Sequence, residues 1–182
     1  MIYLRAVRGP LRASAVLLTA TALLLSACGY KLVRYRGAVG DVRRVAIQTL
    51  ENDSYEPGLD LVVTDALVRE FLRRGALDVV EDPALADLVI EGRVLPVQTA
   101  GRSFSSVLLS LEYQVTLRVA LAVKRRDGTE VPVDPTALTE SELYLASADV
   151  EAARKNRDEA LHRVSTVLAG RVHDALFERL LP

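Results

Sequence analysis

Cysteine and histidine are scarce in this chain of 182 residues, and tryptophan is missing altogether. The single cysteine, Cys28, cannot form a disulfide within the chain. The two histidines, His162 and His173, fall in a segment that we predict to be helical, where their spacing separates them by about 16 Å. They cannot share a metal ion, because its bonds to histidine are about 2 Å long. We therefore expect no metal site and interpret both histidines as solvated helix positions.

The motifs of the common catalytic classes are absent as well. No serine stands in a G-x-S-x-G pattern, and no glycine-rich loop is present that would bind a phosphate. Carboxylates are plentiful, but none forms an isolated pair in an apolar stretch. We predict that the protein is not an enzyme and that it uses no cofactor.

What the sequence does contain is an N-terminal segment unlike the rest. Residues 1–27 include Arg5, Arg8 and Arg12 but no acidic residue, and an apolar run fills residues 13–27. A charged start followed by an apolar run that ends in small residues is typical of an export signal. The run is shorter than the ~20 residues that cross a bilayer. We predict a signal peptide over residues 1–27, with an uncleaved membrane anchor as the alternative.

The end of this segment, Leu25-Ser26-Ala27-Cys28, resembles the lipobox of bacterial lipoproteins. In that class the thiol is acylated, the chain is cut before the cysteine, and the new amine is acylated too. Each buried lipid CH₂ contributes ~0.8 kcal/mol, so several chains hold a protein stably. We predict that Cys28 is a lipid anchor and that residues 28–41 are the lipidated terminus and its linker. Gly29 stands where an aspartate often retains such proteins at the inner membrane, which indicates the periplasmic face of the outer membrane.

The charges are balanced, with 23 basic and 24 acidic residues. Loss of the three arginines of the signal would leave 20 basic against 24 acidic residues, a net charge of −4. Nucleic-acid-binding domains usually carry an excess of positive charge. We therefore expect no nucleic-acid partner.

Residues 42–182 read as a single domain with two amphipathic helices. The first is expected to start at Pro57, which suits an initial helical turn, and to end before Gly75, which suits a left-handed C-cap. The second is expected from about Asp149 to Leu180. Gly170 lies inside it and costs about 1 kcal/mol relative to alanine.

The remaining segments predict strands. Strict alternation over residues 111–123 indicates one long, half-buried strand. The other expected features are a strand over 42–50, a short strand over 76–81, a strand over 88–99 with Gly92 and Pro96 as bulge or edge positions, a loop over 101–106, a hairpin turn at Asp127-Gly128, and a broken strand over 131–146.

These elements predict an α+β fold. The simplest arrangement is a two-layer sandwich, in which a mostly antiparallel sheet of about four strands carries both amphipathic helices on one face.

The densest basic run after the signal is Lys124, Arg125 and Arg126, at the end of the long strand. One interpretation is a solvated strand end beside a turn, and the other is a patch that binds phosphates. Tyr30 and Tyr35 lie near the proposed anchor, where they either belong to the linker or contact the membrane interface or a partner.

Several segments together resemble the lipopolysaccharide-assembly lipoprotein family. They are the start Cys28-Gly29-Tyr30-x-Leu32, the stretch 47–75 with Asn52, Glu56-Pro57-Gly58, Leu59 and Thr64, and the stretch 86–94 with Ala86-Asp87 and Gly92. The resemblance covers roughly residues 25–125. It thins afterwards, and tryptophan, which members often carry, is missing.

The resemblance implies a fold with two helices on a small sheet. It also implies an outer-membrane partner of the lipopolysaccharide translocon, which sits inside a large β-barrel, helps that barrel to assemble and contacts lipopolysaccharide. Some members bind the phosphates of lipopolysaccharide through basic residues, and Lys124, Arg125 and Arg126 are candidates for this role. The competing hypothesis is an outer-membrane lipoprotein that activates a cell-wall synthase or forms part of a secretion assembly.

Overall fold

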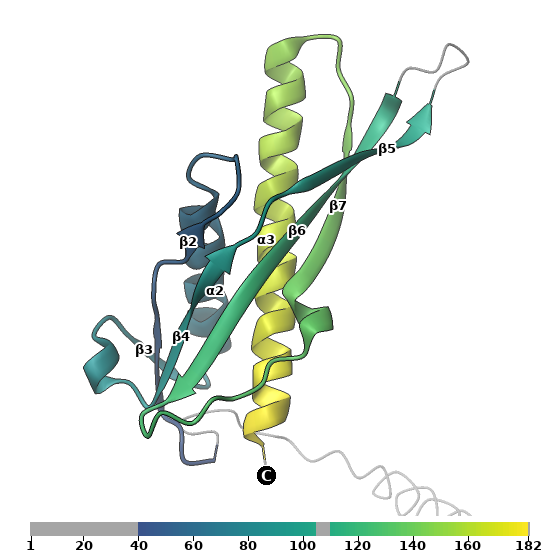
Figure 1. Ribbon diagram of the computed structural model, residues 1–182. Helices are drawn as coiled ribbons and strands as arrows, with labels where there is room; N and C mark the ends of the chain where they lie inside the picture. Colours follow the sequence, from purple (N-terminus) through teal and green to yellow (C-terminus); the bar gives the residue numbers. More distant parts are fainter. Residues whose placement is uncertain (1–39, 105–109, 182) are drawn as a thin grey trace, which may run out of the picture. The chain divides into compact units, whose positions relative to one another are not determined.

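The computed structural model describes residues 40–104 and 110–181. Their elements form one seven-stranded sheet and two long helices (Figure 1). In chain order these are β1 (Arg44–Ile47), β2 (Glu51–Asn52), α2 (Leu59–Arg74), β3 (Asp78–Val80), the 3₁₀ turn η1 (Pro83–Leu85), β4 (Leu88–Val94), β5 (Gln98–Phe104), β6 (Ser110–Arg125), the 3₁₀ turn η2 (Pro135–Leu138), β7 (Thr139–Leu145) and α3 (Val150–Leu180).

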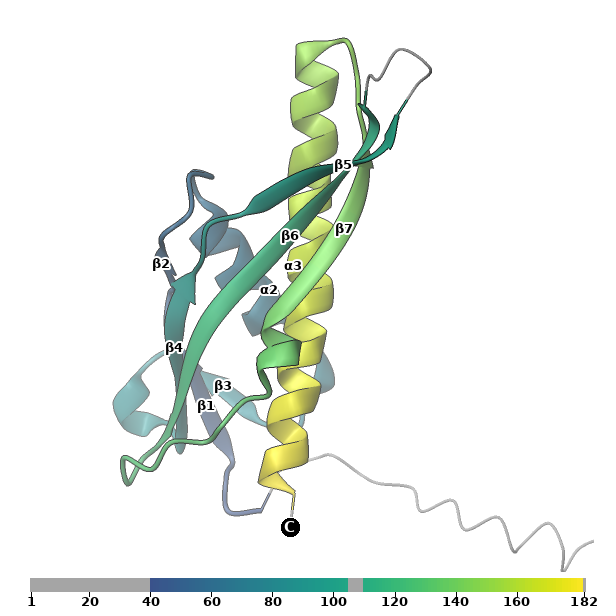
Figure 2. The same ribbon diagram turned by 45° about the vertical axis from the view of Figure 1, so that its right-hand side comes forward.

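The long alternating strand β6 organises the sheet. It pairs antiparallel with β4, β5 and β7, whereas β1 pairs parallel with β3 and β4, and β2 pairs parallel with β4. Figure 2 shows β6 running from the β5–β6 hairpin to the other end of the sheet. The predicted α+β class is confirmed. The sheet has seven strands rather than about four. The segment predicted as one strand over 88–99 divides between β4 and β5, and the two-residue strand β2 lies just after the strand predicted over 42–50.

The division between β4 and β5 is a β-bulge. Val94 pairs with Val119 of β6, and Gln98 pairs with Thr116, so the chain advances four residues against three on β6. The N–H of Leu95 donates to the carbonyl oxygen of Arg118 at 2.9 Å, which keeps the chain against β6 through the irregularity. Pro96 lies inside the bulge, where its missing N–H breaks no ladder bond. The predicted bulge position at Pro96 is confirmed, whereas the same prediction for Gly92 is wrong, because Gly92 pairs in regular register with Leu121 and β4 lies between β1 and β6.

The expected loop over residues 101–106 is wrong for its first part, because β5 continues to Phe104. This stretch pairs with β6 through a register that shifts between Gly101 and Phe104. The shift removes the regular alternation by which a strand is recognised in sequence. The hairpin at Asp127-Gly128 is confirmed: the N–H of Gly128 donates to the Arg125 carbonyl, with a left-handed φ of 86° at the glycine.

The two helices end and begin close to the expected residues. α2 ends at Arg74, and Gly75 follows in a left-handed conformation with its N–H donating to the Phe71 carbonyl at 3.0 Å. α3 begins after Asp149, whose carboxylate accepts the N–H of Ala152. α2 starts at Leu59, two residues later than expected, with Gly58 as its N-cap.

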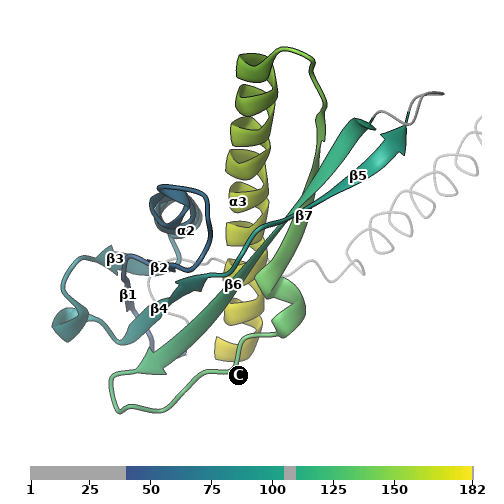
Figure 3. The ribbon, with the colours of Figure 1, turned by 45° about the horizontal axis from the view of Figure 1, so that its top comes forward.

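Both helices cover the same face of the sheet (Figure 1). Figure 3 looks nearly along the axis of α2 while α3 is seen from the side, so the two helices are not parallel. Alternate residues of β6 face the helices and are buried, which places the core between the two layers. The core residues of β6 are Val115, Leu117, Val119 and Val123. No helix of the described residues covers the opposite face.

Candidate functional site

The structure separates the three residues of the basic run. Lys124 pairs with Glu91 of the neighbouring strand β4. Arg125 contacts Asp41 at 2.7 Å, on the segment before β1. Since each cation has its own carboxylate partner, the run is not a concentrated patch of free positive charge.

Arg126 is the third residue of the run, and its contacts are those of a structural residue. Its guanidinium donates to the carbonyl oxygens of Leu85 and Ala86 and contacts Asp87 at 2.8 Å. The Asp87 carboxylate also accepts the N–H groups of Arg43 and Arg44, and these bonds, opposed by burial, lower its pKa. Asp87 therefore joins the β6 end to β1 through hydrogen bonds.

The predicted lipidation site Cys28 lies outside the described residues, as do Tyr30 and Tyr35. Within the described ranges, no helix is long and apolar enough to cross a membrane. The same ranges hold no cluster of three or more acidic, histidine or cysteine side chains that would bind a metal ion.

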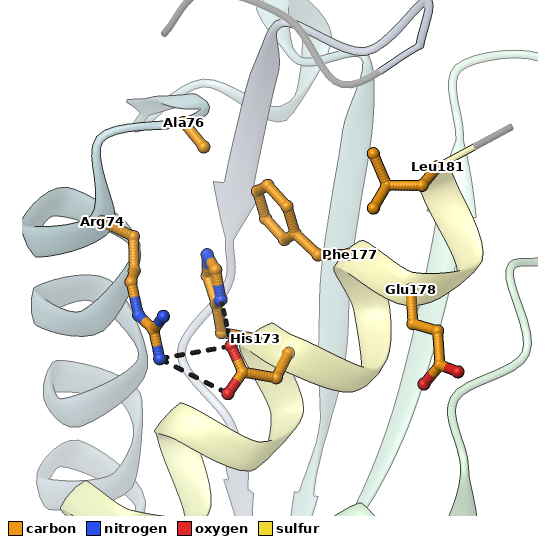
Figure 4. Close-up of a pocket in the computed structure, with 7 residues that line it drawn as sticks. Arg74, Ala76, His173, Phe177, Glu178 and Leu181 are labelled. Atoms are coloured by element: carbon orange, nitrogen blue, oxygen red, sulfur yellow. Dashed lines mark hydrogen bonds and ion pairs between the residues drawn. The ribbon is translucent and has the colours of Figure 1, made fainter. Parts of the chain in front are cut away.

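A pocket of about 310 Å³ lies between the C-terminal ends of the two helices. Figure 4 shows Arg74 and Ala76 on one wall and residues from the end of α3 on the other, with the ring of Phe177 directed into the space between them. The residues that line it are Arg74, Ala76, His173, Asp174, Phe177, Glu178 and Leu181.

His173 corrects an expectation from the sequence, because it is buried, with 5 % of its surface exposed. Its ring stacks on Phe177 at a centroid distance of 4.1 Å and meets the ring of Phe71 edge-on at 5.0 Å. Phe71 comes from α2, so the spacing of residues along α3 cannot reveal this contact. Burial lowers the pKa of His173, although the hydrogen bond to Asp174 opposes the shift. Burial therefore favours the neutral form of the imidazole.

A network of charges connects the two helices beside the pocket. Glu70 is 7 % exposed and accepts hydrogen bonds from Arg73 and Arg74 of its own helix. Arg74 also reaches Asp174 of α3 at 3.2 Å. The hydrogen bonds to Arg73, opposed by burial, bring the pKa of Glu70 down to about 2. The pocket beside this network has an aromatic floor and an acidic rim, and the rim is formed by Asp174 and Glu178.

This arrangement suits binding rather than catalysis. The nearest candidate base, His173, is packed between two aromatic rings, and among the residues that the structure describes no serine, threonine or lysine lines the pocket. An apolar or aromatic group with a positive charge beside it would match the lining. Sequence reasoning missed this site because its walls come from helices about a hundred residues apart in the chain.

The motif residues around Asn52 organise the turn into α2. The Asn52 side chain donates to the Glu56 carbonyl and accepts the N–H of Ser54. Thr64 accepts the N–H of Leu50 and donates to the Asp60 carbonyl, which fixes α2 against the strand segment. These residues therefore define the fold rather than a ligand site.

A second surface lies at the opposite end of α3 from the pocket. A groove of about 760 Å³ is bordered there by Leu111, Tyr113, Tyr144 and the segment before α3. Close to it in the chain, Leu145 and Val150 are 63 % and 80 % exposed. Exposed apolar side chains such as these are candidates for contact with a partner.

Comparison with known proteins gives one family and a set of solved folds. A family model described as "LptE: Lipopolysaccharide-assembly" matches residues 42–176. No curated protein matches the sequence closely enough to count as a relative.

Among solved structures, lipoprotein B from Nitrosomonas europaea is 18 % identical with a TM-score of 0.54, covering 82 % of this chain and 92 % of its own. The hypothetical protein CT253 from Chlamydia trachomatis is 9 % identical with a TM-score of 0.54, covering 76 % and 98 %. Rare lipoprotein B from Shewanella oneidensis is 17 % identical with a TM-score of 0.48, covering 72 % and 95 %. The first two likenesses show the fold.

Proposed function

The chain belongs to the lipopolysaccharide-assembly family LptE, and on this premise we propose that it is an outer-membrane lipoprotein of the lipopolysaccharide translocon. In this proposal, acyl chains on Cys28 hold it at the periplasmic face of the membrane. The domain docks in the translocon β-barrel, helps that barrel to assemble, and assists the insertion of lipopolysaccharide without catalysing a reaction. The observation that carries the proposal is the family match, which spans almost the whole domain.

The geometry supports a docking role through two free surfaces. One face of the sheet carries no helix among the described residues, and the end with Leu145 and Val150 exposes apolar side chains. A protein that works by docking needs such surfaces, because buried apolar area supplies most of the association free energy.

The test is co-purification of the β-barrel with the detergent-solubilised lipoprotein. We expect wild type to retain the barrel, and Leu145→Glu to retain less of it because a charge replaces an exposed apolar contact. Leu72→Glu, at a similarly exposed position on α2, is the matched control and should retain the barrel fully. A lipoprotein that elutes alone or as a large ring would overturn the proposal and favour a cell-wall or secretion role.

The proposal includes contact between the basic run and lipopolysaccharide phosphates. Lys124 is a suitable place to test this, because its charge partner Glu91 can be exchanged with it. We expect Lys124→Glu to weaken lipopolysaccharide binding and to reduce its salt dependence, since phosphate contacts are screened by salt.

The charge-swapped variant Lys124→Glu with Glu91→Lys keeps the cross-strand pair and so separates binding from folding. Recovery of binding in the swap would show that only local positive charge matters. Unchanged affinity in Lys124→Glu at every salt concentration would exclude Lys124 from the contact.

A further inference from the structure

The sheet has two long edges, formed by β5 and β7, and they differ in what covers them. Among the described residues, each of these strands pairs with β6 alone. Side chains of α3 cover the edge of β7: Asn156 donates to the Leu145 carbonyl at 3.0 Å, and Arg163 donates to the Leu143 carbonyl at 3.4 Å. These bonds occupy acceptors that another strand would need, so the edge of β7 is protected against strand addition.

The register of β5 against β6 shows which of its backbone groups are used. In an antiparallel pair, successive residues direct their backbone groups alternately towards the partner strand and away from it. The Leu95 N–H donates to the Arg118 carbonyl, so even-numbered residues of β6 direct their groups towards β4 and β5. Gln98 and Ala100 lie opposite even-numbered residues of β6 and therefore bond to that strand.

The alternate residues of β5, Thr99 and Gly101, direct their N–H and C=O groups to the outer edge. No group of the described residues bonds to these four backbone atoms. The other edge strands, β2 (Glu51–Asn52) and β3 (Asp78–Val80), are only two and three residues long. The edge of β5 is therefore the long edge of the described sheet that is open to another strand.

From this difference between the two edges we infer that the outer edge of β5 binds an extended segment of a partner protein, which adds a strand antiparallel to β5. In this mode of recognition, hydrogen bonds between the main chains supply affinity, and contacts of alternate side chains supply selectivity. The antiparallel direction is the more stable one per residue. The inference does not depend on the lipopolysaccharide function.

A cleft beside this edge can receive side chains of the added strand. It has a volume of about 480 Å³ and lies between the start of α2 and α3. Arg157 borders the cleft and donates to the Thr99 hydroxyl at 2.8 Å, so the cleft meets the helix-facing side of β5 there. A strand ~4.8 Å beyond β5 would direct alternate side chains to this side. Uncharged side chains suit the apolar part of the cleft, which consists of Pro57, Leu59, Val62 and Leu161.

Charge selects among the segments that could bind. Arg102 of β5 is exposed, and its guanidinium has no carboxylate partner among the described residues. The strand Gln98–Phe104 contains no acidic residue. A second copy of β5 would therefore bring another arginine and no carboxylate to this edge. An uncharged segment with one acidic residue near its N-terminal end matches the edge, because an antiparallel strand would place that residue near Arg102.

The test uses a peptide that has these properties, the blocked hexapeptide Glu-Thr-Val-Thr-Val-Thr. Amide hydrogen exchange of the detergent-solubilised full chain is followed by mass spectrometry as the peptide is added. We expect the peptide to slow exchange over residues 97–103, because the outward N–H groups of β5 become hydrogen-bonded. Exchange over residues 139–145 of β7 should not change, because that edge is covered by α3.

A pair of proline variants locates the binding edge. Gly101→Pro removes an outward N–H, and proline is tolerated where the N–H of an edge strand faces solvent. We expect it to weaken peptide binding by about tenfold, which corresponds to the loss of one hydrogen bond. Leu143→Pro is the matched control at an outward position of the covered edge of β7, and it should bind the peptide like wild type.

A charge variant keeps the test decisive if proline disturbs β5. We expect Arg102→Glu to bind the glutamate peptide about threefold more weakly than wild type does, and to bind Lys-Thr-Val-Thr-Val-Thr more tightly than wild type does.

Three results would overturn the inference. The first is wild-type exchange over residues 97–103 that the peptide does not slow. The second is unchanged binding in both Gly101→Pro and Arg102→Glu, with circular dichroism like that of wild type. The third is a dimer that forms without peptide and is abolished by Gly101→Pro, which would assign the edge to a second copy of this chain.

Discussion

Two glycines differ in the space around them: one lies against the backbone of a neighbouring strand, and the other has room for a side chain. Alanine substitutions at the two positions should therefore have opposite effects on stability. A Cβ on Gly92 would lie 2.1 Å from the Ala120 carbonyl oxygen, because β4 approaches β6 closely there. A Cβ on Gly170 would meet only the end of the Glu70 side chain, at 3.8 Å. Gly92 is one of the family motif residues, and this close approach explains its place in the motif.

We expect Gly92→Ala to lower the free energy of unfolding by about 1–3 kcal/mol or more, because backbone must move to relieve the clash. Gly170→Ala, in the interior of α3, should raise it by roughly 1 kcal/mol. Urea unfolding followed by circular dichroism measures both. Equal effects of the two substitutions would contradict the close approach of β4 and β6.

The buried Glu70 carboxylate predicts a dependence of stability on pH. Its pKa is about 2 in the folded protein against an ordinary value of 4.5. Because the folded value is the lower one, the stabilisation is complete above about pH 4.5 and is lost as the pH falls towards 2. We expect wild type to lose more stability than Glu70→Gln over this range, as measured by urea midpoints. His173 is present in both proteins, so it contributes equally to both. If the urea midpoints of the two proteins fell in parallel with pH, a group other than Glu70 would be responsible for the acid sensitivity.

At the scale of elements, Arg157 holds four segments together. From α3 it pairs with Glu56 in the turn before α2 and donates to Thr99 of β5 at 2.8 Å and to the Tyr144 hydroxyl of β7 at 3.4 Å. Within the described part of the chain, the neighbouring Arg154 pairs only with Glu151 and Asp158 of its own helix.

We expect Arg157→Lys to destabilise the domain by about 1–3 kcal/mol, because a lysine cannot make the same planar set of bonds. Arg154→Lys is the control and should change stability by less than about 0.5 kcal/mol, as exposed helical pairs do. Thermal unfolding of the two variants compares them. If Arg154→Lys lowered stability as much as Arg157→Lys, the loss would come from helix propensity and not from the contacts of Arg157 with other segments.

The elements that were predicted well are those with signals local in sequence. The alternation of β6, the left-handed cap at Gly75 and the helix start after Asp149 all depend on neighbouring residues, and the structure has each of them. The short parallel strands and the burial of His173 depend on which segments meet in space. Phe71 and Arg157 make such contacts with residues far away in the sequence, and no local sequence pattern predicts them.

For the whole molecule, the main question is how the domain is attached to the cell envelope. The described residues have their own core, in which buried side chains of the sheet and of both helices pack together. Anchoring and folding should therefore be separable, because the lipid would act only through the linker.

We expect Cys28→Ala to release the protein from the membrane fraction while the domain keeps its circular dichroism spectrum and unfolding temperature. Acyl chains supply the membrane affinity, and they require the thiol. Fractionation together with metabolic labelling by a fatty acid measures the change. Wild-type protein that takes up no label would exclude Cys28 as the anchor.

The bulge at residues 95–97 has a consequence for how the domain tolerates changes in length. Before it, even-numbered residues of β4 such as Val94 point towards the helices, and after it the odd-numbered Thr99 does so and meets Arg157. One residue gained or lost between these strands would turn β5 over, since neighbouring side chains point to opposite faces. The length of this connection between β4 and β5 is therefore fixed, because the contact of β5 with α3 depends on it.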